Sequence, residues 1–230
     1  MPSKRYKKAE SLIEPERNYS LKDAISVLHK FPKAKFNETV ELSFRLGVDP
    51  RQSDQMVRGT VPLPHGSGKT VRVLVFAKPG AAADAARTAG AEFVGFEDMI
   101  KKCNDGWSDF DIAVATPEAM VEVRKLGKVL GPRGLMPNPK TGTVTDDTAK
   151  AVREFKAGRV EFKVDKTGNL HVPVGKLAFT AQQLEENARA VLEAVSKARP
   201  AAAKGIFVRT CVLSATMSPG VRLDTREIVH

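Results

Sequence analysis

The sequence predicts two domains: an α+β domain built from both termini, and an inserted three-layer α/β domain with a parallel, Rossmann-like sheet. The middle of the chain repeats strand and helix patterns with short connections, which is typical of a parallel sheet covered on both faces. Both ends instead show alternating apolar and polar residues beside two amphipathic helices. The charge divides in the same way, since the middle supplies only +2 of the net +10.

The expected domain boundaries lie at two glycine-containing junctions. Residues 1–66 and 159–230 form the terminal domain and residues 67–158 the inserted one, with a hinge near 66–69 and 156–159. The outer segments carry +4 each. A basic excess favours a polyanionic partner, most often a nucleic acid, although solubility alone could explain an excess of this size.

The terminal segments predict two helices with N-terminal caps. Ser20 followed by Asp23 indicates the start of the first helix. Thr180 with Gln183 forms a capping box for the second. Their expected buried faces consist of Leu21, Ala24, Ile25 and Leu28 in the first helix, and of Leu184, Ala188, Val191 and Val195 in the second.

Alternation predicts the strands of the terminal domain. Residues 40–46 form one half-buried strand, and residues 206–214 form the last. Residues 160–164 and 170–174 both alternate, and the turn at 166–169 between them predicts that they pair as a hairpin.

The inserted domain is expected to contain buried strands at 71–76 and 112–115 and a short strand at 93–94. Helices follow at 81–89 and 97–103. Thr116 as N-cap with Pro117 at the first helical position predicts a third helix. Asp146 is expected to cap a last helix that runs to about residue 156.

Several classes of function find no support. No stretch approaches the ~20 apolar residues of a membrane helix, and the basic N-terminus lacks the apolar run of a secretory signal. Cys103 and Cys211 are interpreted as small buried hydrophobes of a cytoplasmic protein. No metal and no cofactor is expected, because the histidines do not have the spacing of metal ligands. The four histidines are His29, His65, His171 and His230.

The segment 66–70, Gly-Ser-Gly-Lys-Thr, superficially resembles a phosphate-binding loop. Such a loop needs a glycine where Leu63 stands, and it must connect a strand to a helix. Here a strand follows instead of a helix. The segment therefore fails on spacing and on context, and we expect a protein that is not an enzyme.

Residues 127–143 combine many glycines and prolines with basic side chains and an exposed-looking Leu-Met pair. We expect a shaped loop without regular structure. It is interpreted either as a plain surface loop or as a recognition surface for a phosphate backbone or a partner.

At this segment the chain resembles the bacterial form of the ribosomal protein one family of the large subunit. Five further blocks occur in the family's order, so the resemblance extends over nearly the whole chain. The matching blocks are residues 35–41, 57–61, 105–107, 130–140 and 165–168, with Thr216 and Met217.

The resemblance implies a fold with a terminal RNA-binding domain and an inserted strand–helix domain. It implies a constituent of the large subunit, at the mobile stalk beside the tRNA exit site. The expected partners are large-subunit ribosomal RNA, deacylated exit-site tRNA that the protein helps to release, and its own messenger RNA, whose translation it represses. The protein is expected to be a ribosome-bound, cytoplasmic monomer without membrane contact.

The resemblance also implies which residues contact RNA. The basic side chains would neutralise phosphate, the threonines would reach 2′-hydroxyls and phosphate oxygens, and the apolar side chains would contact sugars or bases. The implied RNA-binding set is Lys35, Phe36, Thr39, Asp165, Lys166, Thr167, Gly168, Thr216, Met217, Ser218 and Gly220. A second RNA or tRNA contact is implied for Arg133, Asn138 and Lys140.

One departure concerns Ser218, where the family usually has glycine after Thr-Met. Glycine there would allow close approach to RNA, so we expect binding to survive with a modest loss. A serine hydroxyl could bind a phosphate instead, or Gly220 could supply the flexibility. Two other functions stay open: a repressor acting chiefly on messenger RNA, and a nucleotide-dependent enzyme using the strand–helix domain.

Overall fold

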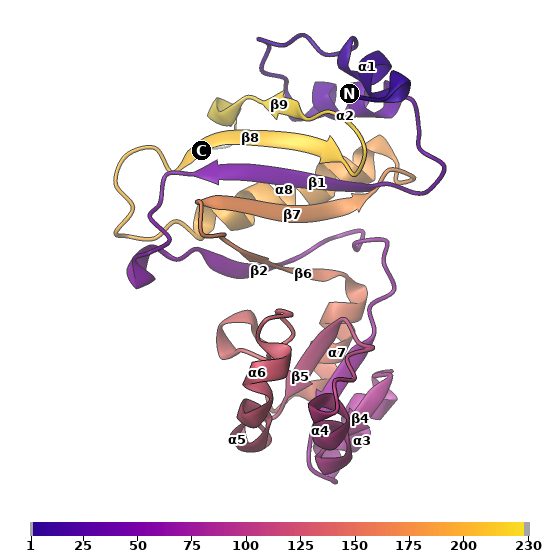
Figure 1. Cartoon of the computed structure of the whole chain (residues 1–230), viewed down its shortest axis with the longest axis vertical. Coiled ribbons are helices and arrows are strands. Elements are labelled where there is room, and N and C mark those ends of the chain that lie inside the picture. The colour runs from indigo at the N-terminus through magenta and orange to yellow at the C-terminus, as the bar shows by residue number, and fades with distance from the viewer. Residues whose placement is uncertain (1, 228–230) are drawn as a thin grey trace. The chain divides into compact units, whose positions relative to one another are not determined.

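The computed structural model describes residues 2–227, apart from the side chains of Lys140 and Glu227. The chain divides into two compact units, a terminal unit of Met1–Gly68 with Val160–His230 and an inserted unit of Lys69–Arg159. Figure 1 labels most of the helices and strands of each unit.

The terminal unit is organised around an antiparallel sheet in the order β7-β1-β8-β9. These strands are β7 (Asn169–Lys176), β1 (Thr39–Leu46), β8 (Val208–Ala215) and β9 (Val221–Leu223). Strand β1 is central, because Leu42 lies opposite Val172 of β7 on one side and opposite Leu213 of β8 on the other. One face of the sheet is buried, as the alternation predicts.

Helices α2 (Leu21–Lys30) and α8 (Ala181–Lys197) pack against the buried face of this sheet. Both caps are confirmed: the Ser20 hydroxyl accepts from the Asp23 amide, and Thr180 and Gln183 form a complete capping box. The predicted apolar faces enter the core. The sequence interpretation missed α1 (Lys4–Glu10), which is capped by Ser3, and the short strand β9.

The predicted hairpin of residues 160–164 and 170–174 is wrong. Strand β6 (Arg159–Lys163) pairs with β2 (Arg58–Pro62) in a separate two-stranded sheet, whereas β7 pairs with β1. The turn between them is closed by the Asp165 amide, which donates to the Asn169 carbonyl at 2.8 Å. Alternation determines which side chains are buried, but it does not determine the partner strand.

The inserted unit contains a parallel sheet in the order β4-β3-β5. Its strands are β3 (Val73–Phe76), β4 (Phe93–Gly95) and β5 (Ile112–Ala115). Helices α3 (Ala81–Thr88) and α7 (Thr148–Ala157) cover one face. The other face packs against α4 (Glu97–Asn104), α5 (Met120–Val123), the 3₁₀ turn η2 (Arg124–Leu126) and α6 (Gly127–Leu130). The unit therefore has three layers.

Two predicted helix starts in the inserted unit differ from the structure. Thr116 does accept from the Ala119 amide at 3.3 Å, but the residues after it form a turn and α5 begins only at Met120. The cap of α7 is Asp147 rather than Asp146, since the Asp147 carboxylate accepts from the Lys150 amide. A neighbouring acidic residue offers the same local signal, and sequence alone does not choose between the two.

The loop of residues 127–143 is more regular and more buried than the sequence indicates. It begins with α6 and contains the 3₁₀ turn η3 (Pro139–Thr141). Leu135 and Met136 are half-buried and pack against the core of their unit. The Thr143 hydroxyl accepts from the Asn138 amide at 2.7 Å, so internal bonds determine the shape of the loop.

Helix α8 presents one polar side chain to the interior. Asn187 is fully buried. Its Nδ2 donates to the carbonyls of Val174 at 2.8 Å and Gly66 at 3.0 Å, and its Oδ1 accepts from the His65 amide at 3.0 Å. One side chain thus fixes the segment around Gly66 to the sheet.

Replacing Asn187 with leucine should lower the free energy of unfolding by about 2–4 kcal/mol, because the buried Val174 carbonyl and two partly buried backbone groups lose their partner. Urea unfolding of the full chain measures this change. Replacing the exposed Gln182 of the same helix with alanine is the control and should stay within ~0.5 kcal/mol. Equal effects of the two substitutions would contradict the role assigned to Asn187.

Candidate nucleic-acid interface

Two loops meet at one end of the central strand: residues 32–38 before β1 (the entry loop) and residues 215–219 after β8 (the exit turn). Because β1 and β8 are antiparallel, the start of one and the end of the other share an edge of the sheet. The Thr39 amide donates to the Thr216 hydroxyl and the Thr216 amide to the Thr39 carbonyl, both at 3.0 Å. The structure thus brings together Lys35, Phe36 and Thr39 with Thr216 and Met217.

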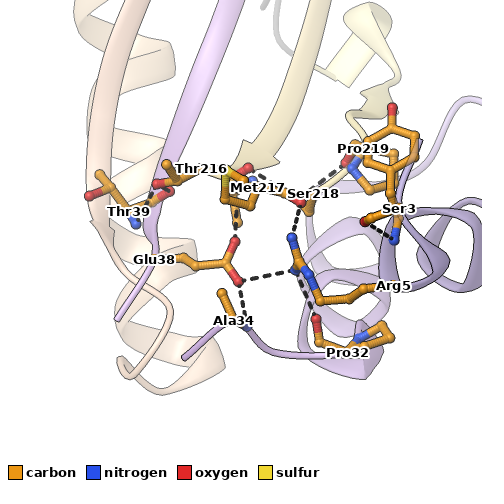
Figure 2. A network of polar contacts seen from close by, with 12 residues as sticks. Ser3, Arg5, Pro32, Ala34, Glu38, Thr39, Thr216, Met217, Ser218 and Pro219 are labelled. Carbon is orange, nitrogen blue, oxygen red and sulfur yellow. Dashed lines mark hydrogen bonds and ion pairs between the residues drawn. The ribbon is translucent and has the colours of Figure 1, made fainter. Parts of the chain in front are cut away.

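Glu38 joins the two loops from the inside, as Figure 2 shows. Glu38 is only 2% exposed. The Oε1 atom accepts from the Ala34 amide at 2.9 Å, and the Oε2 atom accepts from the Met217 amide at 3.1 Å. A buried carboxylate is stable only when its oxygens are bonded. The sequence interpretation did not select Glu38.

Arg5 of helix α1 completes this network (Figure 2). Its Nη2 donates to the Met217 carbonyl at 2.7 Å, and its Nη1 donates to the Pro32 carbonyl at 3.1 Å. The same Nη1 lies 3.6 Å from the Glu38 carboxylate. A residue at the start of the chain therefore bonds to both loops.

Two apolar side chains are exposed at the end of the sheet where the entry loop and the exit turn meet. Phe36 and Met217 are each 54% exposed, and Lys35 beside them is exposed as well. On β7, the Lys176 ammonium donates to the Thr39 hydroxyl at 2.7 Å. Lys176, which the sequence interpretation missed, therefore places a further cation at this end of the sheet.

The predicted RNA-binding residues 165–168 form a second cluster, which lies at the opposite end of β1. The Leu46 amide at the end of β1 donates to the Gly168 carbonyl at 2.9 Å. An eight-residue strand separates the two clusters, or about 24 Å at ~3.4 Å per residue. The predicted RNA-binding residues therefore do not form one compact site, and Lys166 and Thr167 are exposed at the far end.

Asp165 organises the turn of residues 165–169, called the far turn below. Its carboxylate accepts from the amides of Asn169 and Thr167 and from the Thr167 hydroxyl, each at 2.8 Å. These bonds, with the Asn169 amide first, lower the pKa of Asp165 from 3.8 to about 2. Gly168 is buried with φ of 84°, a conformation that favours glycine. Asp165 and Gly168 shape the turn that presents Lys166.

Between the two clusters runs the face of the sheet opposite the core, which is polar. On β1 it carries Glu41, Ser43 and Arg45, half-buried or exposed. The Ser43 hydroxyl lies 3.0 Å from Nδ1 of the exposed His171 on β7. The polar positions of the alternating strands could have revealed this face, but the sequence interpretation used them only to locate the core.

The exit turn accommodates Ser218 without strain. Its hydroxyl accepts from the Ala215 amide at 3.0 Å, so the side chain closes its own turn. Every described residue with positive φ is a glycine, so the Ser218 backbone does not require one. At Gly220, an added Cβ would come within 2.5 Å of the Val212 side chain, so this glycine allows close packing against β8.

The second predicted contact lies in the inserted unit. Arg133 is exposed and Asn138 is half-buried, whereas the side chain of Lys140 lies outside the described residues. All three residues belong to the loop of residues 127–143.

Features of enzymes receive no support from this geometry. Strand β3 follows the segment 66–70, and the Lys69 ammonium pairs with the Asp111 carboxylate at 2.6 Å. Among residues 2–227, no group of three His, Cys, Asp or Glu side chains is placed to hold a metal ion. Cys103 and Cys211 are buried, as interpreted, and burial raises the pKa of Cys211 to about 12. No helix in the described part of the chain is long and apolar enough to cross a membrane.

Residues 28–219 match the model of the ribosomal protein L1p/L10e family. The chain belongs to this family. Two similar proteins, both named large ribosomal subunit protein uL1, support the assignment. The one from Kosmotoga olearia is 52% identical over 228 residues, covering 99% of this chain and 98% of the relative. The one from Protochlamydia amoebophila is 53% identical over 226 residues, covering 98% and 95%. The ribosomal protein L1p/L10e family is structural and not enzymatic, which confirms the expectation from the sequence.

The far turn should lose its order only in strong acid. Because the folded pKa of Asp165 is lowered to about 2, its contribution is complete above pH ~4 and disappears as the pH falls from ~4 to ~2. In an NMR titration, the amide shifts of Thr167 and Asn169 should move together with a midpoint near 2. In Asp165→Asn these shifts should not titrate, and a midpoint near 4 in the unaltered chain would contradict the assigned bonds.

Proposed function

We propose that this protein binds large-subunit ribosomal RNA at the mobile stalk, and that the terminal unit is its RNA-binding domain. As a structural constituent of the large subunit it is ribosome-bound in the cytoplasm, as a monomer. The observation that carries the proposal is the pair Phe36 and Met217, two exposed apolar side chains on hydrogen-bonded loops beside Lys35 and Lys176.

This combination matches the chemistry of folded RNA. Aromatic and thioether side chains contact unstacked bases and sugar faces, while ammonium groups neutralise phosphates. The hydroxyls of Thr39 and Thr216 lie at the same end, where they can meet 2′-hydroxyls. Phe36 is thus a contact residue of the interface and not a core residue.

The two ends of β1 define the course of the bound RNA. Phe36 and Met217 contact it at one end, and Lys166 and Thr167 at the other, about 24 Å away. The polar face with Ser43, Arg45 and His171 lies between them. A contact of this length spans several nucleotides, which fits a structured RNA better than a single nucleotide.

We further propose that the same surface binds the protein's own messenger RNA and so represses its translation. The two RNAs would compete, since both use Phe36, Met217 and the far turn. We assign assistance in releasing deacylated exit-site tRNA to the inserted unit, where Arg133, Asn138 and Lys140 form the second contact. Both functions rest on the family's expected properties together with these residues.

Replacing Phe36 or Met217 with alanine should raise the Kd for a transcript of the large-subunit stalk region about tenfold, because a base loses its apolar contact. Filter binding at fixed salt measures this. Replacing Val121, which is 68% exposed and belongs to the inserted unit, with alanine is the control and should leave the Kd unchanged. Unchanged binding in Phe36→Ala and Met217→Ala would overturn the proposed interface.

Replacing Ser218 with glycine should leave RNA binding intact or strengthen it by no more than about threefold, ~0.7 kcal/mol. Glycine permits closer approach of the backbone, whereas the serine hydroxyl already bonds within its own turn. Titration with the same transcript tests this. A loss of affinity would contradict this expectation and would assign the Ser218 hydroxyl a part in binding, either by contact with the RNA or by closing the exit turn.

A further inference from the structure

Arg5 and Glu38 together hold the two loops that present Phe36 and Met217. Glu38 bonds to the Ala34 amide of the entry loop and to the Met217 amide of the exit turn. Arg5 bonds to the Pro32 carbonyl of the entry loop and to the Met217 carbonyl of the exit turn. Each of the two side chains therefore contacts both loops (Figure 2).

Met217 is held on both sides of its backbone. Its N–H donates to Glu38 and its C=O accepts from Arg5, while its side chain is 54% exposed. Fixing the backbone of one residue costs conformational entropy. Because the Met217 backbone is already ordered in the free protein, RNA binding does not have to order it.

Arg5 itself is poorly placed to contact a phosphate. Its side chain is 26% exposed, and both terminal nitrogens donate to carbonyls of the protein. The guanidinium also lies beside the Glu38 carboxylate, which offsets its charge. Its effect on RNA must therefore pass through the loops that it holds.

We propose that Arg5, and through it the N-terminal helix α1, is a positioning element of the RNA interface. This inference rests on the proposed function and adds a residue outside the implied contact set. Arg5 orders the exit turn and the entry loop in the free protein, so the apolar side chains are presented in the binding geometry before RNA arrives. RNA affinity thus depends on a residue that the RNA does not touch.

The test compares Arg5→Ala, Arg5→Lys and Lys8→Ala in the full chain, with the stalk-region transcript as probe. Lys8 lies on the same helix, is exposed and carries the same charge, so it is the matched control. Arg5→Ala should raise the Kd about tenfold and Lys8→Ala should leave it unchanged. Arg5→Lys should restore affinity only in part, because a single ammonium cannot reproduce the forked contact.

The salt dependence separates positioning from direct contact. Loss of a phosphate contact reduces the slope of log K against log salt by about 0.7–0.9. Arg5→Ala should keep the slope of the unaltered chain, whereas Lys35→Ala should reduce it. A slope reduced in Arg5→Ala by the same amount as in Lys35→Ala would overturn the proposal, and so would an unchanged Kd.

A double substitution shows whether Arg5 acts through Met217. If it does, Arg5→Ala should raise the Kd less in Met217→Ala than in the unaltered chain, the remainder coming from the entry loop, and full additivity would overturn the proposal. Thermal unfolding checks that Arg5→Ala stays folded, and the NMR shifts of the Ala34 and Met217 amides check that the entry loop and the exit turn are altered. Failure of the unaltered chain to bind the transcript overturns the proposed function as well, whereas normal binding with an unaffected Arg5→Ala overturns this inference alone.

Discussion

A carboxylate in a protein interior must have its oxygens bonded, or the fold does not tolerate it. Glu38 meets this requirement with amides from two loops that are far apart in the sequence, and with the guanidinium of Arg5 nearby. The bonds that make its burial acceptable are the bonds that bring the entry loop and the exit turn together. The candidate interface therefore depends on satisfying one buried charge.

Strand β1 connects the entry loop and the exit turn at one end of the sheet to the far turn at the other. It is hydrogen-bonded to β7 on one side and to β8 on the other, so its register determines what meets at each end. The start at Thr39 joins Thr216, and the end at Leu46 joins Gly168. The spacing of the two contact clusters is thus set by strand length, and a change in register would alter both ends together.

The sequence predicted those parts of the fold that depend on nearby residues. The caps at Ser20 and Thr180 involve hydrogen bonds to residues three positions away, so the signal and the partner lie in one short window. The pairing of β6 with β2 could not be predicted in this way, because alternation is the same whichever strand is the partner. The proposed hairpin failed for this reason, although its turn exists.

The candidate site shows the same limit in its individual residues. Phe36, Lys35 and Met217 were selected by resemblance, and the structure shows all three exposed. Asp165 was selected with them, but its carboxylate accepts bonds from its own turn. Glu38 lies in a polar segment whose sequence does not indicate burial. Only the folded structure shows that its carboxylate bonds to both loops.

Arg5 shows why the remaining contacts lie beyond sequence patterns. It donates to the carbonyl of a residue 212 positions away, and the segment around it carries the exposed lysines Lys4, Lys7 and Lys8, which suggest a solvated tail. What distinguishes Arg5 is that the two ends of the chain enter the same unit, so helix α1 lies beside the exit turn that follows β8. A fold built from both termini brings its first residues to its last strands. Arg5, which organises the interface together with Glu38, therefore comes from the N-terminal segment, where local patterns are least informative.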